Sequence, residues 1–188
     1  MPLESEQGAE RINSFALVAY IPHPLGRCLD RLRTDLEPNS LSPRAHVTIL
    51  PPRPLAPDVT PNEAWDFLET WLLEFPPLEV ELEDVAVFAE TNVVFVSLSH
   101  ATTRRLAEMH RQLNFGPLQF RECYEYHPHV TLAQGLTPDQ VDSVEDRARD
   151  RWDTYAGSKK FCVETFTFVQ SLSDKRWIDL NQLTQQAV

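Results

Sequence analysis

Apolar and polar positions follow two different spacings along the chain, and these spacings predict strands and helices in a repeated order. Continuous or alternating apolar runs, the spacing of strands, occur at 15–21, 45–50, 78–82, 93–98, 129–133, 161–169 and 177–180. Apolar residues three or four positions apart, the spacing of helices, occur within 23–36, 60–75, 102–113 and 137–152. Each half of the chain therefore reads strand, helix, strand, helix, strand, and we expect two related lobes.

Local signals refine three of these elements. The sequences Thr-Pro-Asn-Glu at 60–63 and Thr-Pro-Asp-Gln at 137–140 both have the capping-box pattern, with proline at the first helical position. They predict two helices that begin in the same way. Between Leu82 and Val85 the apolar residues change from one strand face to the other, which predicts a β-bulge or a break.

The tripeptide His-Val-Thr occurs twice, each time in an apolar run that predicts a buried strand. Alternate side chains of a strand share a face, so His46 and Thr48 point the same way, as do His129 and Thr131. Histidine has an ordinary pKa of about 6.5, which allows one ring to accept a proton while another donates one. Each histidine alone is also compatible with an ordinary buried strand residue. The pair favours metal-free acid–base chemistry at a phosphodiester, with the hydroxyls as donors to its oxygens.

Weaker candidates lie near the motifs. We expect a substrate pocket formed by Tyr124, Tyr126, His127, Arg44 and Arg53. Partly buried tyrosine and solvated surface arginine are the commoner roles for these residue types. A metal pair of His127 and His129 lacks a third ligand at suitable spacing, so we predict no metal and no cofactor.

Several other polar and aromatic residues receive structural assignments. His23, His100 and His110 lie at or on predicted helices outside the motifs, and we expect them at the surface. We expect Trp177, like the other three tryptophans, to be a packing residue.

Composition narrows the class of partner. The 188 residues carry 28 acidic and 17 basic side chains, a formal net charge of −11. Proteins that hold extended nucleic acid usually present excess Lys and Arg, so a small nucleotide or an RNA end fits better. Three widely spaced cysteines fit free thiols, and no apolar stretch approaches the roughly 20 residues that span a bilayer. We expect a cytoplasmic monomer with no membrane contact.

The motif contexts Ala-His-Val-Thr-Ile-Leu-Pro-Pro at 45–52 and His-Pro-His-Val-Thr-Leu-Ala at 127–133 resemble those of the 2H phosphoesterase superfamily, in particular its 2′-5′ RNA ligase-like group. The resemblance covers about Phe15 to Leu180. It implies a bilobal α+β fold, in which two antiparallel sheets face a central cleft with helices outside. We expect one such two-lobed domain at 12–188, after a flexible segment at 1–11.

The resemblance also implies an activity. Members of the group open 2′,3′-cyclic phosphates or related diesters without a metal, and some join RNA ends reversibly through 2′-5′ bonds. By this analogy His46 is the acid toward the leaving oxygen, His129 is the base toward water, and Thr48 and Thr131 bind phosphate. The leading hypothesis is a cyclic phosphodiesterase acting on nucleotides or RNA ends. The alternative is a nucleotide-binding module without turnover, and a purely structural scaffold is the weakest hypothesis.

Overall fold

The computed structural model describes residues 9–38 and 43–185, and its elements follow the predicted order. They are β1 (Arg11–Tyr20), α1 (Leu25–Leu36), β2 (His46–Arg53), α2 (Pro61–Leu72), β3 (Leu78–Phe88), β4 (Val93–Leu98), α3 (His100–Leu113), the 3₁₀ turn η1 (Gly116–Leu118), β5 (Val130–Ala133), α4 (Pro138–Asp153), β6 (Lys160–Val163), β7 (Thr165–Leu172) and β8 (Trp177–Thr184). Most of the segment predicted to be flexible, 1–11, lies outside the described residues, and Arg11 already belongs to β1.

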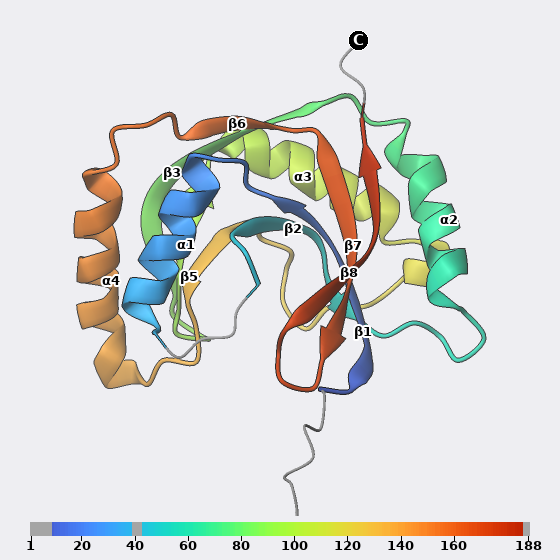
Figure 1. Ribbon diagram of the computed structural model, residues 1–188, viewed down its shortest axis with the longest axis horizontal. Helices are drawn as coiled ribbons and strands as arrows, with labels where there is room; N and C mark the ends of the chain where they lie inside the picture. The colour runs from blue at the N-terminus through green and yellow to red at the C-terminus, as the bar shows by residue number, and fades with distance from the viewer. Residues whose placement is uncertain (1–8, 39–42, 186–188) are drawn as a thin grey trace, which may run out of the picture.

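The strands form two antiparallel four-stranded sheets, which confirms the predicted α+β class (Figure 1). The first sheet has the order β2-β1-β7-β8 and the second has the order β5-β4-β3-β6. Both motif strands, β2 and β5, are edge strands of their sheets, and they contact one another across the middle of the molecule. The topology therefore brings together two motifs that are far apart in the sequence.

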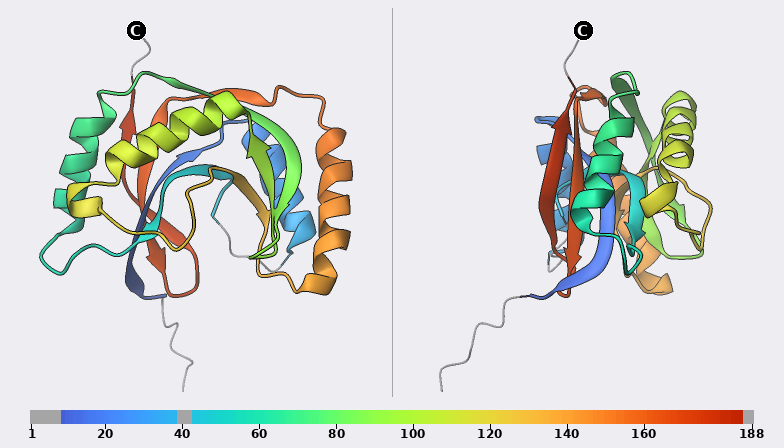
Figure 2. Two further views of the ribbon diagram at one scale, coloured as in Figure 1. Left: turned by 180° about the vertical axis from the view of Figure 1, so that it is seen from behind. Right: turned by 90° about the vertical axis from the view of Figure 1, so that its right-hand side faces the viewer.

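The helices lie around the sheets in an exchanged arrangement. α1, from the first half of the chain, packs against β5 and lies beside α4, at the left of Figure 1. α3, from the second half, packs against β2, and the rear view of Figure 2 shows it crossing the back of the strands. Each motif strand is thus supported by a helix from the other half of the chain.

Apolar side chains cover both faces of the first sheet. Its helix-facing side belongs to the main core, with Leu17, Val47 and Phe168 at most 1% exposed. Its opposite side carries a small second cluster of Ala16, Val18 and Val169, against which Tyr20 and Trp177 pack. The sheet residues beside the first motif are therefore apolar on this face, where Val18 lies opposite Thr48.

The local signals hold in the structure. The Thr60 N–H donates to the Glu63 carboxylate at 2.8 Å, and the Thr137 N–H donates to Gln140 Oε1 at 2.9 Å. The pairing of β3 with β4 shifts register between Leu82 and Val85, as the change of apolar face predicts.

The sequence predicts one strand over 161–169, but the structure has two strands there. The run 161–169 divides at the exposed Glu164 into β6, which pairs with β3, and β7, which pairs with β1 and β8. The chain thus passes from the second sheet to the first within a single run that the sequence pattern predicts as one strand. None of the helices formed by residues 9–38 and 43–185 has the length and apolar character needed to cross a membrane.

Candidate active site

The first motif opens β2. His46 is its first residue and lies opposite Tyr20 of β1, while Thr48 lies opposite Val18. The half-buried His46 ring contacts two aromatic rings of the same sheet, with centroid separations of 4.9 Å to Trp177 and 6.3 Å to Tyr20. The first histidine therefore lies on an apolar face of the sheet, beside the aromatic rings of Trp177 and Tyr20.

The second motif occupies the equivalent place at the edge of the other sheet. Thr131 pairs with Phe95 of β4, and His129 directly precedes β5. The His129 ring meets Phe88 and Phe95 edge-on at 4.9 and 5.3 Å, and these two phenyl rings stack at 4.0 Å. The second histidine is thus packed against an aromatic pair that no motif signal in the sequence indicated.

Both histidine rings are oriented by the same backbone contact. His46 Nδ1 lies 2.7 Å from the Arg44 carbonyl, and His129 Nδ1 lies 2.7 Å from the His127 carbonyl. A carbonyl only accepts, so each Nδ1 carries a hydrogen and donates it. The other ring nitrogen, Nε2, is left in each case to accept or donate a proton during chemistry.

The rings are close enough to interact electrostatically. The pKa of His46 is lowered to about 4, mainly by burial; the bond to the Arg44 carbonyl opposes this shift, and the nearby charges of Arg33 and His129 contribute to it. Burial also lowers the pKa of His129, but there the neighbouring charge that contributes is that of His127.

Helix α1 anchors the backbone at both motifs. The Asp30 carboxylate accepts from the Ala45 N–H at 2.6 Å, directly before His46. The Glu37 carboxylate accepts from the Gln134 N–H at 3.0 Å, directly after β5. Helix α1 and the residue that follows it, Glu37, therefore bind the backbone at the start of one motif strand and at the end of the other.

A polar group borders the first motif. Tyr20 donates to Asp179 at 2.6 Å, and the exposed Arg44 guanidinium lies 3.9 Å above the Tyr20 ring and 3.4 Å from Asp179. Burial raises the pKa of Tyr20, as does its bond to Asp179, so the hydroxyl stays protonated. Of the predicted pocket residues, Arg44 is placed beside His46 with its charge at the surface.

Two predicted pocket residues lie elsewhere. Arg53 is 1% exposed and bound to Glu122 at 2.5 Å, so neither the pocket lining nor the surface position expected from sequence is correct. Tyr126 is half-buried with its hydroxyl bonded to the Thr48 carbonyl, and its ring stacks on His110, not on an open face. His110 itself is buried, which corrects its expected surface position.

The remaining candidates are divided. His127 is exposed and meets Phe88 edge-on at 5.4 Å, on the same side as His129. Tyr124 is 62% exposed in the loop before the second motif, without a described contact to the motif residues. Trp177 is a further residue beside the site that sequence reasoning missed, since it was expected to be an ordinary packing residue. Trp177 begins β8, which pairs with β7 at the other edge of the sheet from β2, so only the three-dimensional structure reveals its ring contact with His46.

Comparison with known proteins identifies relatives of this arrangement. A family model described as the 2′-5′ RNA ligase superfamily matches residues 21–175. The structure of E. coli LigT complexed with 3′-AMP is similar at 16% sequence identity, with a TM-score of 0.60 over 96% of this chain and 100% of that one. Kluyveromyces marxianus Usb1 is similar at 16% identity, with a TM-score of 0.54 over 89% of this chain and 97% of that one. A search of curated protein sequences finds no significant match.

Proposed function

The chain belongs to the 2′-5′ RNA ligase superfamily, and on that premise we propose that it is a metal-independent phosphodiesterase that opens 2′,3′-cyclic phosphates on nucleotides or RNA ends. The family and fold, which confirm the resemblance to 2H phosphoesterases, indicate a phosphoesterase-type enzyme. The particular ester and the roles of the motif residues are our proposal.

The observation that carries the proposal is the matched orientation of the two imidazoles. His46 and His129 each donate Nδ1–H to the carbonyl two residues earlier, so both leave Nε2 for proton transfer. Hydrolysis of a cyclic diester needs one group to accept a proton and one to supply it. Two imidazoles oriented alike on the edges of neighbouring sheets meet that need with protein groups alone.

The proposed reaction balances its protons within the site. A water oxygen attacks phosphorus while the neutral imidazole takes a proton from that water. The bond from phosphorus to the ribose 3′ oxygen breaks, and the protonated imidazole gives its proton to the departing oxygen. The product is a terminal 2′-phosphate, and the two rings have exchanged protonation states. Thr48 and Thr131 donate hydrogen bonds to the non-bridging oxygens, where negative charge increases in the transition state.

The surroundings of the rings favour roles opposite to those assigned by resemblance. His46, with its pKa lowered to about 4, is neutral near pH 6 and suits the base. The reaction also needs a protonated ring to supply a proton to the leaving oxygen, and with His46 as the base this role passes to His129. We therefore propose His46 as base toward water and His129 as acid toward the 3′ oxygen. In the reverse, ligation-type reaction the roles exchange.

A nucleotide or RNA end is the substrate class that agrees best with the charge of the chain. The net charge of −11 disfavours contact with a long phosphate backbone. Among the similar structures, LigT was solved with 3′-AMP and Usb1 with uridine monophosphate, both single nucleotides. The exposed His127 and Arg44 lie at the two sides of the motif histidines and are proposed to contact the ribose or phosphate.

The test is incubation of the protein with each 2′,3′-cyclic nucleotide in excess chelator, with the product identified by ³¹P NMR. We expect 2′-monophosphate and a bell-shaped dependence of kcat/KM on pH, centred below pH 6.5 because both pKa values are lowered. If the protein binds nucleotides without hydrolysing them, the enzyme hypothesis is wrong and the alternative, a nucleotide-binding module, is favoured.

The roles of the histidines can be separated with a p-nitrophenyl phosphodiester, whose leaving group needs no proton. His129→Gln should regain turnover on this ester relative to the cyclic substrate, whereas His46→Gln should not. The opposite pattern would restore the assignment made from the resemblance.

A further inference from the structure

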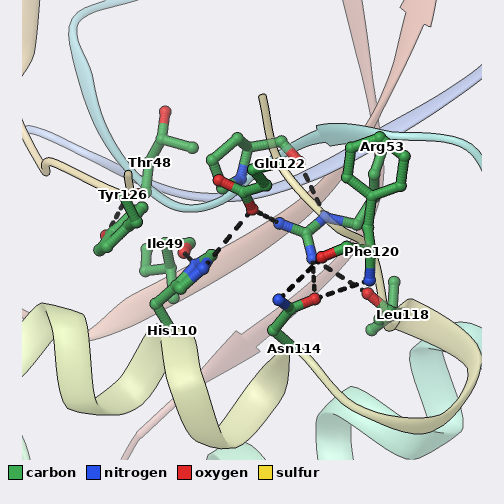
Figure 3. A network of polar contacts seen from close by, with 10 residues as sticks. Thr48, Ile49, Arg53, His110, Asn114, Leu118, Phe120, Glu122 and Tyr126 are labelled. Carbon is green, nitrogen blue, oxygen red and sulfur yellow. Dashed lines mark hydrogen bonds and ion pairs between the residues drawn. The ribbon is translucent and has the colours of Figure 1, made fainter. Parts of the chain in front are cut away.

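Three backbone carbonyls that follow the first motif histidine are all bound by side chains (Figure 3). The Thr48 carbonyl accepts from the Tyr126 hydroxyl at 2.7 Å, and the Ile49 carbonyl accepts from His110 Nδ1 at 2.9 Å. The Pro51 carbonyl accepts from Arg53 Nε at 2.9 Å. These groups belong to the strand that presents His46.

The reason these carbonyls need partners lies in β2 itself. The pairing with β1 passes from Val18–Thr48 to Leu17–Leu50, so Ile49 is an extra residue in a β-bulge. β2 is also an edge strand, with one side of its backbone unpaired by any neighbouring strand. A buried carbonyl without a partner is costly, so Tyr126 and His110 from outside the sheet and Arg53 at the end of β2 bind these carbonyls.

The side chains that bind β2 also bind one another. The Arg53 guanidinium, with a fully buried side chain, lies 2.5 Å from Glu122 and donates to Asn114 Oδ1 at 2.7 Å. Glu122 lies 3.5 Å from His110 Nε2, and the His110 ring stacks on Tyr126 at 3.9 Å with an interplanar angle of 4°. The result is one connected polar network.

The network ends beside the second motif. Tyr126 directly precedes His127, whose carbonyl orients the His129 ring. The segment from Asn114 to Tyr126 has η1 as its only helix or strand, so its position depends on such contacts. The same tyrosine thus touches the backbone of the first motif and lies three residues before the second histidine.

We propose that Tyr126, supported by His110, Glu122 and Arg53, is a positioning residue that sets the separation and orientation of the two motif histidines. Buried ion pairs such as Arg53–Glu122 contribute little net stability compared with apolar packing, so geometric specificity is the better account of this one. The inference deepens the proposed function, because a fixed separation is what an in-line displacement between two imidazoles requires.

The test compares Tyr126→Phe with a matched control, Tyr155→Phe. Both changes remove one hydroxyl from a stacked tyrosine, but the buried Tyr155 hydroxyl has no described hydrogen-bond partner and its ring stacks on Trp152. On a 2′,3′-cyclic nucleotide we expect Tyr126→Phe to lower kcat about tenfold with KM changed less than about threefold. Tyr155→Phe should leave both unchanged. Equal kcat in the two variants would overturn the proposal.

A second readout does not depend on catalysis. NMR titration of the imidazole signals gives the pKa of His46 with and without His129→Gln, and the difference measures the coupling of the two rings. We expect Tyr126→Phe to reduce this difference by at least half, and Glu122→Gln to reduce it less. The same coupling in both backgrounds would refute the positioning role. If no cyclic nucleotide is hydrolysed, the proposed function is wrong. The NMR measurement of the coupling between the two rings then still tests the positioning role of Tyr126.

Discussion

The two motif histidines share a backbone arrangement and differ in their surroundings. Each stands at the beginning of an edge strand, donates Nδ1–H to the carbonyl two residues earlier and precedes a threonine on the same face. His46, however, lies between Trp177 and Tyr20, while His129 lies against the stacked rings of Phe88 and Phe95.

This difference separates what the repeated motif determines from what its neighbours determine. The repeat fixes which ring nitrogen is presented, because the contact is made by the local backbone. The affinity of each ring for a proton depends on burial and on nearby charge, which for His46 includes Arg33 of α1 and for His129 includes His127. Two copies of one motif thus lie in two different electrostatic environments.

The largest expected effect is the loss of either imidazole. His46→Gln and His129→Gln should each lower turnover of a 2′,3′-cyclic nucleotide by about 10²- to 10⁴-fold. The double variant should be little worse than either single one, since the rings act in one step. Initial rates with circular dichroism as the fold control measure this, and wild-type turnover in either variant would remove that residue from the mechanism.

A smaller effect concerns acid stability. The pKa of His46 is about 4 in the folded protein and about 6.5 in the unfolded chain, so the unfolded chain binds more protons between these pH values. Folding stability is therefore lost as pH falls from 6.5 toward 4, by at most about 2 kcal/mol at pH 5. His46→Gln should lose less stability than the wild type between pH 7.5 and pH 5 in urea unfolding. If both proteins lost the same stability between these pH values, the pKa of His46 would not be lowered in the folded protein.

The aromatic neighbours allow each pKa to be moved separately. Trp177→Ala admits water to His46 and should raise its pKa, which shifts the acid limb of kcat/KM upward by roughly one unit. Phe88→Ala should do the same to His129 and shift the alkaline limb instead. Profiles recorded with chelator present distinguish the two, and movement of both limbs in one variant would contradict separate environments.

The smallest effect is expected at the polar border of the first motif. The Arg44 and Asp179 side chains are 64% and 36% exposed and 3.4 Å apart, a geometry worth a few tenths of a kcal/mol. Asp179→Asn should change the free energy of unfolding by less than about 0.5 kcal/mol. Chemical denaturation measures this, with Glu122→Gln, which breaks a buried pair, as the contrasting variant. If Asp179→Asn lowered the free energy of unfolding as much as Glu122→Gln does, the Arg44–Asp179 pair would not be weak.

Features that depend on nearby sequence could be predicted. The helix starts at Thr60 and Thr137 and the register change after Leu82 follow from residues within a few positions. The four motif residues could be selected because their pattern repeats. Local spacing therefore yielded most of the elements and the center of the candidate site.

Features that depend on distant partners could not. Arg53 and His110 were expected at the surface because charged and polar side chains are usually exposed. Arg53 is buried because Glu122, 69 positions away, neutralises it, and His110 is buried because the Ile49 carbonyl, 61 positions away, accepts its hydrogen. The division of 161–169 between two sheets likewise depends on pairing with β3 and β1, which spacing does not specify.

The exchanged packing of α1 and α3 bears on how the molecule can be divided. Since α1 packs against β5 and α3 packs against β2, neither half of the chain contains the helix that packs against its own motif strand. A polypeptide cut at the turn between β3 and β4 should give two fragments that stay inactive apart and regain a working center only when mixed. Although the sequence looks duplicated, its two halves depend on each other for packing, so neither half should work as a separate module.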